Sequence, residues 1–313
     1  MDIPALELTA LSKSFGQLRA VEDIDLIIRR GEVVALLGPN GAGKSTTIDL
    51  ALGLAHPSRG TARLFGGDPR AAIVAGRVGA MLQGGALLPT TTVRQSIALV
   101  AAAHRAPLSI DDALDRAGIR DLAKQRVSKL SGGQLQRARF AIAVVSNPDL
   151  LILDEPTAAM DVESRRGFWH SMREFTDQGR TVVFATHYLD EADSFADRIV
   201  ILNSGRIVAD GTPAEVKSVV SGRSIRFEVD AGAADAASSA LARLGGIRAL
   251  EQRATRFTLV SDDSDASLRS ILQLIPTAHC IEVTTHTMDD AFIALTAARI
   301  SEPAKFETVS TGA

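Results

Sequence analysis

Short runs of consecutive apolar residues recur along the first two thirds of the chain, and segments with apolar residues at helical spacing separate them. The runs at 33–37, 150–153 and 181–185 are the clearest, and such runs are typical of strands buried on both faces of a parallel sheet. The other expected strands are 5–9, 24–28, 77–82 and 198–202, and the expected helices are 45–54, 163–178 and 189–196. This alternation of strands and helices predicts an α/β fold.

Two stretches depart from the alternation. Between about 84 and 146 the spacing is helical, which predicts a helical subdomain with helices at 92–103, 111–117 and 132–146. After residue 221 the expected order is β-α-β-β-α-β, the order of a ferredoxin-like α+β domain, and a last helix follows at 288–298. We therefore expect a first domain at 1–220, an accessory domain at 221–300 and a disordered polar tail at 301–313.

Composition limits the class of protein. A chain of 313 residues with 46% hydrophobic and 23% charged residues fits a globular protein of two domains. The net charge is −3 and aromatic residues make up 4%, so we expect no nucleic-acid partner. The sequence shows neither a secretory signal pattern nor an apolar run of the roughly 20 residues that a membrane-spanning helix needs. Other chains would have to supply the span if this protein works at a membrane.

The single cysteine, Cys280, excludes an intramolecular disulfide and fits a reducing compartment. His279 and His286 lie near it in the sequence, but their spacing matches no familiar metal site. Free cysteine is among the most buried residue types, so we expect Cys280 to be a buried thiol.

Residues 38–46 form the first chemical motif, which has the pattern G-x-x-x-x-G-K-[ST] of a phosphate-binding loop between an apolar strand and a helix. Gly41 and Gly43 let successive backbone N–H groups point at phosphates. Lys44 is expected to reach the β- and γ-phosphates, and Ser45 to place its hydroxyl on Mg²⁺. The expected ATP contacts are Gly38, Pro39, Asn40, Gly41, Ala42, Gly43, Lys44, Ser45 and Thr46.

Four polar side chains follow expected strands, at the edge of the sheet where α/β proteins bind ligands. Asp154 is expected to face Mg²⁺ through water, and Glu155 to orient or deprotonate the water that attacks the γ-phosphate. His187 is expected to donate to the γ-phosphate and to hold that water. Gln83 is expected to contact Mg²⁺ and the water through its neutral amide.

Residues 130–134, Leu-Ser-Gly-Gly-Gln, are a second glycine-rich element, at the start of an expected helix whose free N–H groups favour an anion. Ser131 is expected to bond a γ-phosphate oxygen, while Gly132 and Gly133 allow close approach and Gln134 completes the element. The alternative is a helix cap without a ligand, which leaves two glycines unexplained at the start of a helix that they weaken. One nucleotide needs only one such device, so the pair indicates ATP held between two copies of the chain.

The order of these motifs resembles the ATP-binding subunits of ABC transporters over about residues 5–220. The matching positions are residues 38–46, Gln83, residues 130–134, residues 150–155, Asp161 and His187. The resemblance implies a head-to-tail dimer with ATP between residues 38–46 of one subunit and residues 130–134 of the other. It also implies that Phe15 stacks on adenine and that Asp161 takes part in communication between subunits. Residues 158–160 read Ala-Ala-Met where the family more often has Gly-Leu before the aspartate.

Residues 287–296 are similar to the end of drug-exporter ATPases of the daunorubicin-resistance type. That resemblance implies an ATP-hydrolysing motor for export of drugs or other small hydrophobic molecules, bound to separate transmembrane permease subunits at the cytoplasmic face of the membrane. The alternatives are an importer ATPase, a soluble ABC-type ATPase of translation or DNA repair, and a regulatory module that only senses ATP. The sequence has no tandem ATPase domain or coiled coil to favour the soluble class, and Lys44, Asp154, Glu155 and His187 are intact, which argues against a mere sensor.

Overall fold

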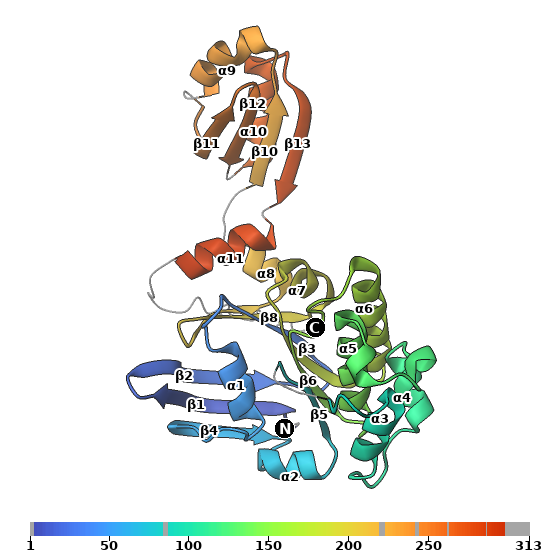
Figure 1. The fold of residues 1–313 in the computed structure, drawn as a ribbon. Helices are drawn as coiled ribbons and strands as arrows, with labels where there is room; N and C mark the ends of the chain where they lie inside the picture. Colours follow the sequence, from blue (N-terminus) through green and yellow to red (C-terminus); the bar gives the residue numbers. More distant parts are fainter. Residues whose placement is uncertain are drawn as a thin grey trace, which may run out of the picture. The chain divides into compact units, whose positions relative to one another are not determined.

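The computed structural model describes residues 3–83, 87–218, 223–241, 244–261, 263–285 and 287–297. These residues fall into two units, the first ending at Pro213 and the second spanning Ala214–Ala297 (Figure 1). The predicted domain boundary, at 220–221, and the predicted tail, at 301–313, both lie outside the described residues.

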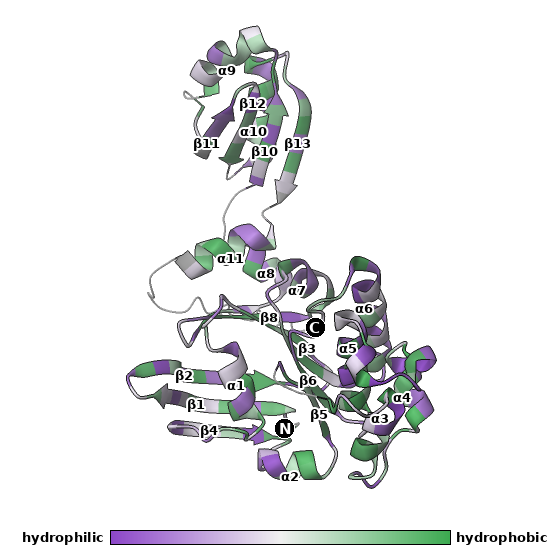
Figure 2. Cartoon of the chain, in the orientation of Figure 1, coloured by the Kyte–Doolittle hydropathy of each residue, from purple (hydrophilic) through white to green (hydrophobic). Residues whose placement is uncertain are grey.

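A six-stranded sheet forms the centre of the first unit, with strand order β5-β6-β7-β3-β8-β9. All neighbours in it are parallel except β8 and β9. The strands are β3 (Val33–Leu37), β5 (Val78–Met81), β6 (Leu150–Asp154), β7 (Thr181–Ala185), β8 (Arg198–Asn203) and β9 (Arg206–Gly211). Every residue of β3, β6 and β7 is buried, as their apolar runs predict, and Figure 2 shows the hydrophobic colour along β3 and β6.

A second, antiparallel sheet in this unit has the order β2-β1-β4. Its strands are β1 (Leu6–Phe15), β2 (Leu18–Ile28) and β4 (Arg59–Leu64). The predicted strands at 5–9 and 24–28 were too short, and β4 and β9 were missed. The reason is that these strands are only half buried, so polar residues interrupt their apolar pattern.

Helices complete the first unit. Helix α1 (Lys44–Ala51) contacts strands of both sheets, and α2 (Pro69–Val74), which was not predicted, follows β4. The predicted helical subdomain consists of α3 (Val93–Ala101), α4 (Ile110–Arg116) and α5 (Gly132–Val144), with 3-10 turns at Arg120–Leu122 and Val127–Lys129. Helices α6 (Val162–Thr176) and α7 (Leu189–Phe195) flank β7 in the sequence.

An aromatic cluster, buried except for the half-buried Phe195, packs α6 and α7 against β7. The Trp169 ring stacks on Phe195 with centroids 4.6 Å apart, and meets the edge of Phe184 at 4.7 Å. Such aromatic pairs contribute about 0.5–1.5 kcal/mol each beyond the area that they bury. The cluster therefore holds the end of β7, from which residues 186–188 continue toward the candidate site.

The second unit contains an antiparallel four-stranded sheet with strand order β11-β12-β10-β13. Its strands are β10 (Arg223–Glu228), β11 (Ile247–Arg253), β12 (Arg256–Ser261) and β13 (His279–Thr285). Its helices are α8 (Pro213–Ser218), α9 (Ala234–Leu241), α10 (Ser264–Leu274) and α11 (Met288–Ala297), with a 3-10 turn at Ala231–Ala233. From β10 to β13 the elements follow the predicted β-α-β-β-α-β order, around a core that includes Phe227, Phe257 and Ile271.

Cys280 is exposed, so the expectation of a buried thiol is wrong. The cysteine lies in β13, an edge strand of the sheet. The pairing of β13 with β10 shifts register between Arg226 and Glu228, and the extra residue falls on β13. Such a bulge redirects side chains, and the apolar residues around Cys280 gave no sign of it.

Candidate nucleotide site

The phosphate loop, residues 38–46, joins β3 to the N-terminus of α1, as predicted. Gly41 and Gly43 have φ of 80° and 102°, which L side chains rarely adopt. A Cβ on Gly43 would lie 2.4 Å from the carbonyl oxygen of Ala20 in β2, so only glycine fits there. The glycines thus let the loop turn into α1 with its first N–H groups free to bind an anion.

Lys44 is buried, with 8% of its surface exposed, and its ammonium donates to the carbonyl oxygens of Gly38 and Pro39 at 2.6 and 3.2 Å. Burial lowers the pKa of Lys44, and the carboxylates of Glu155 and Asp154 act in the opposite direction. The amine is therefore held within the loop, beside the two carboxylates. A bound phosphate group would offer the ammonium charged oxygens, and a hydrogen bond to a charged oxygen is stronger than one to a carbonyl oxygen.

Ser45 and Asp154 meet although 109 positions separate them. The Ser45 hydroxyl donates to Asp154 Oδ2 at 2.8 Å, and Asp154 is 5% exposed at the end of β6. Hydroxyl and carboxylate oxygens are the hard donors that Mg²⁺ prefers. These two residues fit a magnesium ion, whose binding would replace the direct bond between them.

Glu155 and His187 also meet, at the ends of β6 and β7. His187 Nδ1 lies 2.7 Å from Glu155 Oε2, and the Glu155 side chain is 15% exposed. Burial raises the pKa of Glu155, while the charge and hydrogen bond of His187 and the charge of Lys44 oppose the rise. Glu155 has a φ of 51°, a conformation that costs a non-glycine residue of order 1–3 kcal/mol and that clusters at functional sites.

Gln83 and Phe15 make no hydrogen bond or ion pair with these residues in the described part of the chain. Gln83 is exposed just after β5, whose Met81 pairs with Leu153 in β6, so it starts from the same edge of the sheet as Asp154. Phe15 ends β1, is 54% exposed, and has the Lys13 ammonium 5.1 Å from its ring centroid. Their expected roles toward ATP and Mg²⁺ stay predictions.

Ser131 caps helix α5. Its hydroxyl accepts from the Gln134 N–H at 3.3 Å, and the Gln134 side chain accepts from the Ser131 N–H at 3.0 Å. A Cβ on Gly132 would lie 3.1 Å from the Cβ of Ala159, so packing within the chain already favours glycine there. The capping alternative is therefore present locally, while Ser131 and Gly132 remain exposed and accessible to a second subunit.

Asp161 caps helix α6. Its carboxylate accepts from the Ser164 N–H at 2.7 Å and from the Ser164 hydroxyl at 2.9 Å, and these bonds lower its pKa. Ala159, where the sequence departs from the family pattern, has a φ of 63°. Glycine, the usual residue of the family here, adopts this conformation without strain. Alanine at this position therefore carries backbone strain that the family's glycine avoids.

A buried glutamate that the sequence analysis missed connects the segments after β6 and β7. Glu191, 3% exposed, accepts from the Thr157 hydroxyl at 2.6 Å and from the Thr186 hydroxyl at 3.1 Å. Thr157 lies two residues after Glu155, and Thr186 directly precedes His187. Glu191 lies in a helix whose acidic sequence is typical of a solvent-exposed helix. The only feature of the sequence that could have indicated a role at the site was its position four residues after His187.

Two more contacts extend this network. The Arg165 Nε lies 3.4 Å from a Glu191 oxygen, an ion pair rather than a well-directed hydrogen bond, and the guanidinium stacks 4.1 Å from the Tyr188 ring centroid. The Gln136 amide of α5 donates to the carbonyl oxygen of Glu155 at 3.3 Å. The strained backbone of Glu155 is thus held at its carbonyl oxygen by Gln136 and at its N–H by the carbonyl oxygen of Ala185.

Comparisons with known proteins agree with this geometry. Residues 21–158 match the model of the ABC transporter family. The chain is 33% identical to the daunorubicin/doxorubicin resistance ATP-binding protein DrrA of Streptomyces peucetius over 93% of this chain and 92% of that protein. It is 37% identical to the Nod factor export ATP-binding protein I of Paraburkholderia xenovorans over 67% of this chain and 71% of that protein.

Solved structures give the same fold. One, described as an ATP-binding subunit of an ABC transporter, superposes with a TM-score of 0.63 at 27% identity, over 69% of this chain and 92% of that one. A dimeric bacterial ABC transporter cassette superposes with a TM-score of 0.61 at 26% identity, over 66% of this chain and 98% of that one. Together with the phosphate loop, the two carboxylates and the histidine, these findings show that the chain belongs to the ABC transporter family and is one of its ATP-hydrolysing, ATP-binding subunits.

Proposed function

We propose that this chain is the motor subunit of an exporter of drugs or other small hydrophobic molecules, working as a dimer with separate transmembrane permease subunits. The observation that carries the motor role is the Glu155–His187 pair, placed beside the Ser45–Asp154 pair at one edge of the sheet. The names of the relatives, drug resistance and Nod factor export, favour export over import.

The chain's residues divide the work of phosphoryl transfer. The phosphate loop and Lys44 bind the phosphates, and Ser45 and Asp154 hold Mg²⁺, which when bound neutralises charge on the β- and γ-phosphates. Glu155 accepts the proton of the attacking water or orients that water, and its raised pKa suits a base that works near neutral pH. His187 holds Glu155 through Nδ1 and keeps Nε2 for the γ-phosphate.

We propose a head-to-tail dimer in which Ser131 and Gly132 of each copy cover the nucleotide bound by the other. In support, these two residues are exposed, and the phosphate loop and residues 130–134 share no hydrogen bond or ion pair within the described chain. A cassette of similar fold is described as dimeric. In the same proposal, Phe15 stacks on adenine and Asp161 takes part in communication with the opposite subunit.

A hydrophobic pocket supports a membrane partner. It has a volume of about 230 Å³ and lies between the end of β5 and the helical subdomain. Its lining includes Leu82, Leu88, Leu99, Val100 and Ile142. Leu88 and Leu99 are 56% and 64% exposed, which is unusual for leucines beside an apolar pocket.

We propose that a short helical segment of the permease docks in this pocket, so that Gln83 and the helical subdomain pass motion on to the membrane subunits. Among the described residues no helix is both long and apolar enough to cross a bilayer. Attachment at the cytoplasmic face of the membrane would then occur through that partner.

The test is ATP hydrolysis by the full chain purified with its native permease in lipid. Drug-like hydrophobic compounds are expected to stimulate the rate, and Glu155→Gln in the same complex is the matched control for contaminating ATPases. Stimulation only by compounds delivered with an external binding protein would favour import. RNA- or DNA-dependent hydrolysis without the permease would favour the soluble class, and an intact complex with no hydrolysis would leave a nucleotide sensor.

A further inference from the structure

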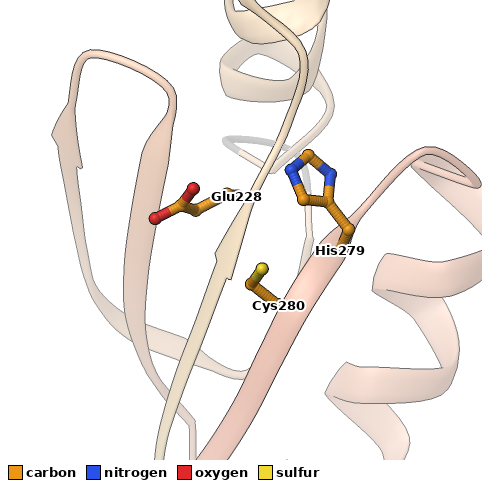
Figure 3. A group of neighbouring side chains, drawn as sticks. All are labelled: Glu228, His279 and Cys280. Carbon is orange, nitrogen blue, oxygen red and sulfur yellow. The ribbon is translucent and has the colours of Figure 1, made fainter.

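The bulge in the second unit brings three metal-binding side chains together. Glu228 ends β10, and His279 and Cys280 begin the neighbouring strand β13 (Figure 3). One ligand atom from each residue lies within 4.8 Å of the others, without any ion present. None of the three belongs to the nucleotide site.

The backbone explains why two consecutive residues of one strand join the same cluster. Consecutive side chains of a regular strand point to opposite faces. Here Glu228 pairs with His279, and the extra residue of the bulge lies between His279 and Glu282. Cys280 has a φ of 50°, which redirects its side chain toward the other two. This left-handed conformation is unfavourable for cysteine, but it brings the Cys280 side chain to Glu228 and His279 and so completes the set of three ligands.

Two of the side chains are already oriented by neighbours. His279 Nδ1 lies 3.1 Å from the Thr277 carbonyl oxygen, which favours a proton on Nδ1 and leaves Nε2 as a lone-pair donor. Metal-binding histidines commonly show this arrangement. Arg256 donates twice to Glu228, at 2.6 and 2.9 Å, and both bonds end on Oε1. Neither of these two bonds uses Oε2.

We propose that Glu228, His279 and Cys280 form a binding site for a thiophilic divalent metal ion, with Zn²⁺ as the ion that fits best. A thiolate, an imidazole and a carboxylate are the donors of three-ligand zinc sites, which keep a fourth position for water. Bond lengths of 2.0–2.3 Å place tetrahedral ligands about 3.6 Å apart, so modest side-chain rotations from the present separations close the site. Binding releases the thiol proton to solvent.

Mg²⁺, the ion expected at the nucleotide site, is not a competitor, because it prefers oxygen ligands in an octahedral arrangement. Arg256 opposes the binding of a cation at the cluster, because its positive charge lies beside the cluster and is paired with Glu228. An arginine at this distance weakens the affinity for a cation without removing the donors. The site therefore stands apart from ATP hydrolysis and depends on this unit alone.

Cobalt(II) titration of the reduced, metal-free full chain tests the site directly. Thiolate-bound Co²⁺ gives a charge-transfer band in the near ultraviolet, and Cys280 is the only cysteine in the chain, so any such band reports this residue. We expect the band to saturate at one Co²⁺ per chain, to disappear on addition of equimolar Zn²⁺, and to persist in millimolar Mg²⁺.

Variants distinguish a metal site with three ligands from metal binding by the Cys280 thiol alone. Cys280→Ser should abolish the band, and His279→Ala and Glu228→Gln should each weaken Co²⁺ binding at least tenfold. Arg256→Ala should tighten it, because a repelling charge is removed. His56→Ala, at an exposed histidine of the first unit, is the matched control and should change nothing. No band, a band at one metal per two chains, or wild-type affinity for Co²⁺ in both His279→Ala and Glu228→Gln would overturn the proposal.

Discussion

His187 Nδ1 lies 2.7 Å from Glu155 Oε2, and this bond joins the ends of two adjacent parallel strands. An ionised carboxylate can only accept a hydrogen bond, so Nδ1 is the donor when Glu155 is charged. The carboxylate is partly buried beside Lys44 and Asp154, whereas the imidazole is 53% exposed. The base is therefore sheltered from solvent, and the histidine is accessible to a ligand.

Glu155→Gln should stop turnover while leaving ATP binding intact. The amide keeps the shape and a hydrogen bond to His187 but cannot accept a proton, and loss of a general base costs about 10²–10⁴-fold in rate. With hydrolysis blocked, Mg-ATP should accumulate a dimer that is visible by sedimentation velocity. A monomer at saturating Mg-ATP would contradict the shared nucleotide site. The exposed Glu163→Gln is a control for the change of charge.

The same substitution should stabilise the nucleotide-free protein in a pH-dependent way. Burial raises the pKa of Glu155 above its usual 4.5, so the folded chain binds this proton more tightly than the unfolded chain. The stability that results is fully present below pH 4.5 and is lost as pH rises through the folded pKa. The Tm of Glu155→Gln minus that of the wild type should therefore be larger at pH 8 than at pH 4. A difference that is constant or shrinks with rising pH would show that the pKa is not raised.

Ala159→Gly should relieve backbone strain next to residues 130–134. A non-glycine residue at a φ of 63° costs about 1–2 kcal/mol, and the greater freedom of glycine in the unfolded chain cancels about 0.5–1 kcal/mol of the gain. The net effect on the free energy of unfolding in urea should lie between about 0 and 1.5 kcal/mol of stabilisation. Ala158→Gly, one residue earlier and without a positive φ, is the control and should destabilise by about 0.4–1 kcal/mol. Equal destabilisation by both variants would contradict the strain.

Glu191 should act on catalysis by positioning Glu155 and His187. Glu191→Ala leaves the buried Thr157 and Thr186 hydroxyls without their acceptor, at a cost of about 1–3 kcal/mol for each unsatisfied group. Glu191→Gln retains one acceptor and the side-chain volume, so it should fold and show a lower kcat with an unchanged KM for ATP.

The pH dependence of the rate distinguishes positioning from a purely structural role, because a smaller folded fraction also lowers the apparent kcat without changing KM. Loss of fold would lower the active fraction of Glu191→Gln and leave the pH dependence of the remaining activity unchanged. Altered placement of Glu155 should move the acidic limb of the rate profile. Asp190→Ala, at the exposed neighbouring position, should leave both kcat and KM at wild-type values.

Sequence patterns predicted the strands that are apolar throughout, and they missed strands in which polar residues interrupt the apolar ones. Strands β3, β6 and β7 are buried on both faces, so their residues are uniformly apolar and easily recognised. Strand β4 has only one buried residue, and its sequence Arg-Gly-Thr-Ala-Arg-Leu carries no alternation that distinguishes it from a loop. Cys280 was misplaced because a register shift between paired strands is not written in either strand alone.

The sequence by itself determined the chemistry of this protein: a phosphate loop, an acid pair and a histidine, each at a strand end, and a second glycine-rich element at residues 130–134. These features are local, because motif spacing and strand-to-helix transitions depend on neighbours along the chain. Only the tertiary structure decided which of these groups meet. It paired Ser45 with Asp154 and Glu155 with His187, buried Glu191 against Thr157 and Thr186, and gathered Glu228, His279 and Cys280. The reason is that strand order and register fix such distances, and both arise from packing between segments far apart in sequence.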